Sequence, residues 1–154
     1  MNDAEPGSLV KKVTIDLDPV NAFDLFTTRM AVWWPLSTHS VGLEHATDVQ
    51  VGTGVGGDIV ETRTDGSTSI WGTIDVWEPP ERIRFTWHPG TPADEATLVE
   101  VRFEASDTGT TLVLTHSGWD RRPDGDGARA QYDKGWEFVL GLYANAGDGA
   151  PRDT

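Results

Sequence analysis

The sequence predicts an α+β fold: a curved antiparallel sheet of about six or seven strands wrapped around one long C-terminal helix, with two short helices after the first strand. Segments between residues 9 and 116 alternate apolar and polar side chains and are separated by turn residues, as strands do. Residues 126–147 instead place apolar side chains three and four positions apart, as in a helix with one buried side. Strands in one block with the helices outside it favour an α+β arrangement over repeated β–α units.

The first strand and the two short helices are expected in residues 9–35. Residues 9–17 alternate in the manner of a strand. Asp18 and Pro19 predict a helix start, because Asp can cap the first turn and Pro fits the first helical position. A further turn extends to Trp33, and Pro35 ends it. The side expected to be buried consists of Val20, Phe23, Leu25 and Phe26.

Residues 36–47 show no regular period and are expected to form a loop that carries His39 and His45. Loops of this length are often functional. After a short strand at 48–51, four glycines between positions 52 and 57 predict a turn. Their spacing matches neither the dinucleotide fingerprint nor the P-loop, so we expect no phosphate site there.

The remaining strands are expected between turn residues such as Asp65-Gly66 and Thr108-Gly109. They are residues 58–63, 70–77, 82–87, 98–105 and 110–116.

The strand at 70–77 raises a question about Trp71 and Trp77. Regular alternation places Ile74 on the inner face and both tryptophans on the outer, convex face. Two exposed indoles would form an apolar patch, which often marks a partner surface such as a dimer contact. The alternative is that a β-bulge inverts the faces locally.

Asp126 to Gly147 are expected to form the long helix. Asp124 or Asp126 can cap its start, and Gly147 is expected to end it in a left-handed conformation. Its apolar stripe, which Phe138 and Leu142 widen, consists of Tyr132, Trp136, Val139, Leu140 and Tyr143.

Composition excludes several classes of protein. With 12 basic and 25 acidic residues the net charge is −13, which would repel nucleic acid. No apolar run is long enough for a membrane helix, and no secretory signal is visible. The absence of cysteine fits a cytoplasmic location. We expect a single domain over residues 1–154, with residues 1–8 and 148–154 frayed.

Five short stretches carry a resemblance to a known family. They are Val32–Pro35 (VWWP), Gly72–Ile74 (GTI), Glu78–Arg82 (EPPER), Phe85–Trp87 (FTW) and Gly135–Trp136. With the order of elements, they resemble the START-like helix-grip superfamily, also called SRPBCC, and its branch named after activators of a heat-shock ATPase. The resemblance covers residues 9–147 and implies a single START-like domain.

A narrower likeness connects the tryptophan-rich segments. Trp33-Trp34-Pro35, His116 with Trp119-Asp120-Arg121, and residues 133–136 are similar to self-resistance proteins of enediyne antibiotic producers. Proteins of that group share the fold, bind the toxic natural product and are cleaved while destroying it. The resemblance implies a comparable binding role, but it places no cleavage site in this sequence.

A strongly curved sheet is not filled by one helix along its whole length, so the fold implies an apolar cavity between them. The sheet and the helix supply the walls, and three tryptophans on connections can close the mouth. Alternatively, the same side chains pack on one another. The predicted ligand-binding residues are Trp33, Trp34, Ile74, Phe85, Trp87, Val101, Phe103, Trp119, Tyr132, Trp136 and Leu140.

Signals for catalysis or metal binding are weak. His39, Glu44 and His45 share a loop, but their spacing is not that of a metal site, and no cofactor is expected. His116 and Asp120 could act as a base and its orienting group. The alternative is that they make a strand-end hydrogen bond or an ion pair with a neighbouring arginine.

Three functions remain open. The first is non-catalytic binding of a hydrophobic, aromatic or polycyclic small molecule, for carriage, sequestration or antibiotic self-resistance. The second is an enzyme resembling polyketide cyclases, aromatases or hydrolases that uses the same cavity. The third is a protein-interaction module of the heat-shock ATPase activator kind, using Trp71 and Trp77 or the acidic surface, and a homodimer is the protein partner considered.

Overall fold

The computed structural model describes residues 7–149. The strands are β1 (Leu9–Ile15), β2 (Ala46–Val51), β3 (Asp58–Arg63), β4 (Thr68–Glu78), β5 (Arg82–Trp87), β6 (Thr97–Ser106) and β7 (Gly109–Ser117). The helices are α1 (Pro19–Phe26) and α2 (Gly125–Gly149), with 3₁₀ turns η1 (Met30–Val32), η2 (Leu43–His45), η3 (Ala93–Glu95) and η4 (Trp119–Arg121). All seven strands form one antiparallel sheet in the order β1-β7-β6-β5-β4-β3-β2.

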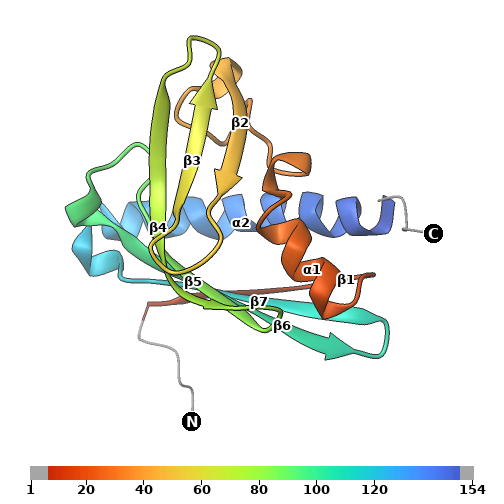
Figure 1. Ribbon diagram of the computed structural model, residues 1–154. Helices are drawn as coiled ribbons and strands as arrows, with labels where there is room; N and C mark the ends of the chain where they lie inside the picture. Colours follow the sequence, from red (N-terminus) through yellow and green to blue (C-terminus); the bar gives the residue numbers. More distant parts are fainter. Residues whose placement is uncertain (1–6, 150–154) are drawn as a thin grey trace.

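The sheet bends around α2. In Figure 1, β2, β3 and β4 stand steeply across α2, whereas β1, β6 and β7 run beneath it. The pairing of β4 shifts register twice. With β3 the shift lies between Ile59 and Val60 of β3, and with β5 it lies between Ile74 and Val76 of β4. Such bulges bend a strand and increase its twist. The predicted α+β helix-grip fold is confirmed, with α1 and η1 following β1.

The prediction that Trp71 and Trp77 share an exposed face is wrong, and the alternative of a bulge is correct. The register shifts leave Trp71 and Asp75 without a directly opposite partner, so the alternation of side chains is interrupted between them. Trp71 is completely buried. Trp77 is partly buried and packs edge-on against Phe23, with ring centroids 5.2 Å apart. The two indoles therefore form no exposed patch.

Two apolar residues expected in the core face solvent instead. Val20 is 61% exposed, because α1 turns its Phe23 side toward the sheet. Phe138 is 53% exposed. An α-helix turns about 100° per residue, so Phe138 lies far around α2 from Tyr132 and Trp136.

The C-terminal half of α2 approaches β1 closely. Gly147 does not end the helix as predicted, since α2 continues to Gly149. A Cβ atom at Gly147 would lie 2.2 Å from Cγ1 of Ile15, so the glycine permits the contact between helix and sheet. Lys11 of β1 adds ion pairs to Asp133 and, at 3.0 Å, to Glu137.

The predicted frayed ends fall mostly on residues 1–6 and 150–154, which lie outside the described residues. The backbone carbonyls of Gly7 and Ser8 accept hydrogen bonds from the Arg129 guanidinium. None of the helices within residues 7–149 combines the length and apolar character needed to cross a bilayer.

Candidate functional site

A cavity of about 300 Å³ lies at one end of the space between the sheet and α2. It is bounded by α2, by the loop that follows η1 and by the connection from β5 to β6. Its principal lining residues are Trp34, Val41, Trp87, Tyr132, Trp136 and Val139. Its rim includes Val41 and Gly90, both exposed, so the cavity opens to solvent at this end.

Four tryptophans pack together, and we call them the tryptophan cluster: Trp34, Trp71, Trp87 and Trp136. Trp34, Trp87 and Trp136 form the inner wall of the cavity. The ring centroids of Trp34 and Trp87 are 5.8 Å apart, as are those of Trp87 and Trp136. Trp71 lies behind this wall, 5.3 Å from Trp34 and 5.6 Å from Trp87. Tilted and edge-on ring contacts of this kind are the favoured geometries, so the indoles pack favourably on one another in an apolar wall.

Tyr132 supplies a polar group at the cavity. Its hydroxyl accepts a hydrogen bond from Trp87 Nε1 at 3.0 Å. Burial raises the pKa of Tyr132, although the hydrogen bond from Trp87 lowers it in part, so the phenol stays protonated at neutral pH. A hydroxyl that accepts one hydrogen bond keeps its own proton to donate. Tyr132 can therefore offer that proton to a ligand.

The loop after η1 forms the opposite wall, which we call the loop wall: His39, Ser40 and Val41. Trp34 Nε1 donates to the backbone oxygen of His39 at 2.7 Å. The His39 ring stacks on the exposed Phe138 of α2, with ring centroids 5.3 Å apart. Burial lowers the pKa of His39, which favours the neutral imidazole at pH 7. The loop wall thus bridges the interior and the outer side of α2.

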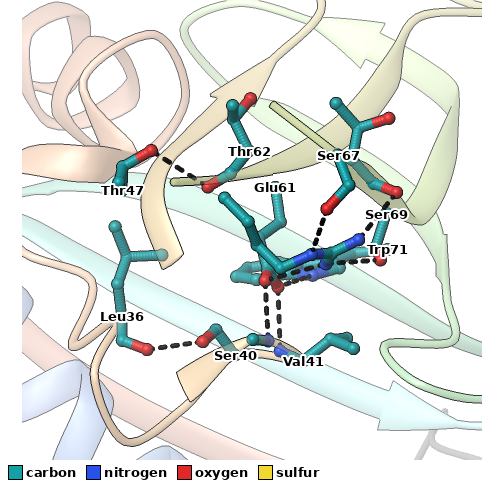
Figure 2. Close-up of polar contacts among 12 residues, drawn as sticks. Leu36, Ser40, Val41, Thr47, Glu61, Thr62, Ser67, Ser69 and Trp71 are labelled. Atoms are coloured by element: carbon teal, nitrogen blue, oxygen red, sulfur yellow. Dashed lines mark hydrogen bonds and ion pairs between the residues drawn. The ribbon is translucent and has the colours of Figure 1, made fainter. Parts of the chain in front are cut away.

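Sequence reasoning missed Glu61, a fully buried carboxylate on β3. Figure 2 shows it between Val41 and Trp71, and it accepts hydrogen bonds from Val41 N at 2.8 Å and Trp71 Nε1 at 2.9 Å. Burial alone would raise the pKa of Glu61, but hydrogen bonds from Val41, Gly42, Trp71 and Arg63 lower it below its ordinary value. The alternation of β3 could have revealed this residue, because Glu61 shares the inner face with Ile59.

His116 is buried behind the tryptophan cluster, and both of its ring nitrogens have hydrogen-bond partners. Its Nδ1 accepts from Trp136 Nε1 at 3.0 Å, and its Nε2 lies 2.6 Å from Thr97 Oγ1. Burial lowers the pKa of His116 to about 3, with a smaller effect from Arg122, so the ring is neutral. Asp120 is exposed on η4. It is not the partner of His116, because Trp136 and Thr97 already contact the two ring nitrogens of His116. In this structure His116 is therefore part of the core.

The structure brings four of the predicted ligand-binding residues to the cavity: Trp34, Trp87, Tyr132 and Trp136. Trp119 lines a second hollow of about 860 Å³ at the start of α2. The others are buried in the core: Trp33, Ile74, Phe85, Val101, Phe103 and Leu140. The cavity thus occupies one end of the interior rather than its whole length.

No group of three or more acidic, histidine or cysteine side chains within residues 7–149 is arranged to hold a metal ion. His39 lines the cavity, whereas Glu44 and His45 are exposed on η2.

Comparison with known protein families identifies the family of this chain. Residues 16–141 match the family described as activator of Hsp90 ATPase homolog 1-like protein (AHSA1). The chain belongs to this family. The match spans most of the sequence and confirms the resemblance to the START-like superfamily, whose fold binds ligands. No curated protein matches the sequence.

Three solved structures of this fold are informative. Txn09, an anthrahydroquino-γ-pyrone synthase in complex with SUM, is 28% identical with a TM-score of 0.62, over 94% of this chain and 99% of Txn09. DynU16, a putative protein in the dynemicin biosynthetic locus, is 18% identical with a TM-score of 0.68, over 94% of this chain and 48% of DynU16. The Aha1 dimer from Colwellia psychrerythraea is 19% identical with a TM-score of 0.67, over 94% of this chain and 98% of that one. The last two show the fold alone.

Proposed function

We propose that this protein binds a flat aromatic small molecule in the cavity beside the tryptophan cluster, for carriage or sequestration. The observation that carries the proposal is the 300 Å³ cavity with indole walls and a phenol donor, open at its rim. Pockets with apolar aromatic walls and a few placed polar groups are the usual sites for small molecules. The proposal treats residues 1–154 as one START-like domain acting in the cytoplasm.

The lining residues restrict the chemistry of the ligand. Within the described chain they include no Asp, Glu, Lys or Arg side chain, so a buried ionic group on the ligand would lack a charged partner. The net charge of −13 disfavours anionic ligands further. The volume suits about two or three fused rings. A neutral polycycle with a carbonyl or hydroxyl oxygen for Tyr132 meets these conditions.

The similarity to Txn09 supports this ligand class, because the name of that enzyme describes an oxygenated aromatic polycycle. A suitable probe is therefore 1,8-dihydroxyanthraquinone, which is planar and carries carbonyl and hydroxyl oxygens. Wild-type protein should show saturable quenching of its tryptophan fluorescence when this probe is added.

Gly135 offers a direct test, because it lines the cavity on α2 and a Cβ atom there would meet nothing within 4 Å. Gly135→Leu should fill the cavity and raise the Kd at least about tenfold without disturbing the fold. Gly141→Leu is the matched control: it is also on α2 with open space at the Cβ position, but it does not line the cavity. Absence of saturable quenching in the wild type, or equal Kd values for both variants, would refute the proposal.

An enzyme is the second candidate, and the 28% identity to a synthase favours it specifically. Tyr132 could polarise a ligand carbonyl while the cavity folds a flexible chain for cyclisation. Turnover of a linear polyketide analogue, slowed by Tyr132→Phe, would support this function. Binding without product formation would favour the carrier.

Two narrower roles remain proposals. Self-resistance predicts that the protein protects DNA from an activated enediyne or is itself cut into discrete fragments. Self-association is suggested by the dimer of the Colwellia protein and can be measured by sedimentation. Because Trp71 and Trp77 are not exposed as a pair, they no longer support an interaction module.

A further inference from the structure

We propose that Glu61 is the positioning residue of the cavity: its carboxylate holds the loop wall and the tryptophan cluster in place together. The inference rests on the proposed function where it concerns ligand affinity, but the positioning itself can be measured without a ligand.

The carboxylate of Glu61 is shared equally between the loop and the sheet. Oε1 accepts from Val41 N at 2.8 Å and from Trp71 Nε1 at 2.9 Å. Oε2 accepts from Gly42 N at 2.8 Å and from Arg63 Nη1 at 3.2 Å. Each oxygen therefore joins one backbone N–H of the loop to one side chain of the sheet (Figure 2).

Only an acceptor fits at this position. All four partners of Glu61 are donors, and an ionised carboxylate carries acceptors alone. A glutamine would place its NH₂ group where one oxygen now faces two donors, so two hydrogen bonds would be lost in either orientation. Because the side chain is completely buried, water cannot simply replace them.

Arg63 helps to hold the carboxylate of Glu61 in place. Its Nη1 also donates to Ser69 Oγ at 2.8 Å, its Nε to Ser67 Oγ at 2.8 Å, and its Nη2 to the backbone oxygen of Thr68 at 3.1 Å. The turn after β3 and the first residues of β4 thus hold Arg63, and Arg63 in turn orients Glu61.

The partners of Glu61 lead to both walls of the cavity. Val41 lines it directly, and its backbone N–H is bonded to Glu61. Trp71 does not line it but packs on Trp34 and Trp87, which do. One carboxylate therefore fixes the spacing between the loop wall and the tryptophan cluster. This spacing is the dimension that a flat ligand would fill.

Gly42 shows how closely the loop approaches. A Cβ atom there would lie 2.5 Å from Arg63 Cδ and 2.9 Å from Glu61 Oε2. Gly42→Ala should therefore push the loop away while leaving the carboxylate intact. It is an independent variant acting from the loop side, useful should Glu61→Gln fold poorly.

The test compares Glu61→Gln with Glu100→Gln, a strand glutamate that pairs with Arg82 and Arg102 on the sheet. Hydrogen exchange of the Val41 and Gly42 amides is measured first, without ligand. Glu61→Gln and Gly42→Ala should accelerate it at least about tenfold, and Glu100→Gln should leave it unchanged. The Kd of 1,8-dihydroxyanthraquinone should rise at least about tenfold with Glu61→Gln and stay within about twofold with Glu100→Gln.

A double-variant cycle with Val41→Ala separates positioning from general destabilisation. If Glu61 acts through the loop wall, its effect on Kd and that of Val41→Ala should be non-additive, whereas Glu100→Gln and Val41→Ala should add. Unchanged exchange at Val41 and Gly42, or a Kd unaffected by faster exchange, would overturn the inference. If Glu61→Gln accelerates the exchange but the wild-type protein does not bind the probe, the proposed function is overturned while the positioning role of Glu61 is supported.

Discussion

The two ends of the interior use similar aromatic residues but are covered differently. At one end α1 lies over the sheet, and Phe26 packs against Trp33, Phe103 and Tyr143 with centroid distances of 5.3 to 5.9 Å. At the other end α2 and the loop after η1 together cover the tryptophan cluster, and α1 contributes no residue to the lining of the cavity. We call these the closed end and the open end.

In this protein, the cavity beside the tryptophan cluster lies where a loop, rather than α1, packs against the aromatic residues. A helix satisfies its own backbone groups and can press an apolar side into the core. A loop carries backbone N–H groups that need outside partners. At the open end Glu61 satisfies two of them, and the loop stands far enough from Trp87 and Trp136 to leave a cavity.

The largest effect is expected from Phe26→Ala at the closed end. It removes a completely buried ring from tight packing and should lower the free energy of unfolding by about 3–5 kcal/mol. Chemical denaturation measures this loss. The Kd of the anthraquinone probe, determined where the variant is folded, should stay within about twofold of wild type. A large change in Kd would mean that the two ends are coupled.

A smaller effect is expected from His116, which lies behind the open end. Its pKa of about 3 in the folded state is below the ordinary 6.5, so the unfolded chain binds more protons between these values. The free energy of unfolding should therefore fall as pH decreases below 6.5, by up to about 1.4 kcal/mol per pH unit from this group. His116→Gln should show a flatter decline between pH 6.5 and 5, when denaturation is measured at each pH. An unchanged slope would show that His116 does not stay neutral.

The smallest effect contrasts one tyrosine at each end. Tyr143→Phe at the closed end loses the hydrogen bond from its hydroxyl to the Ala22 carbonyl, 2.6 Å long, and should cost about 0.5–1.5 kcal/mol of stability with no change in Kd. Tyr132→Phe at the open end should instead raise the Kd about three- to tenfold, because the ligand loses a donor. Reversed effects in the two variants would contradict the division into two ends.

The sequence allowed the fold to be predicted because long periodic segments dominate it. Tyr132, Trp136 and Tyr143 follow the helical spacing closely enough to orient α2 from the sequence alone. Trp71 could not be placed, because the bulges of β4 depend on pairing with β3 and β5, which a single strand's pattern does not reveal.

The candidate site was predictable only in part, for a related reason. Large aromatic residues indicated its walls, and Trp34, Trp87, Tyr132 and Trp136 do line the cavity. Glu61 was missed because its role depends on N–H groups of a loop that has no periodic signal. The six core residues of the predicted set lie outside the cavity, because they pack against other side chains in a way that only the tertiary structure determines.

The central claim is that the open end receives the ligand, and the indole N–H signals of the tryptophans test it directly. We expect ¹H–¹⁵N spectra recorded during titration with 1,8-dihydroxyanthraquinone to shift the signals of Trp34, Trp87 and Trp136, which line the cavity. The signal of Trp77, in the apolar groove beside α1, should stay in place. A shift of Trp77 without the other three, or no shift of any indole at saturating probe, would contradict the account.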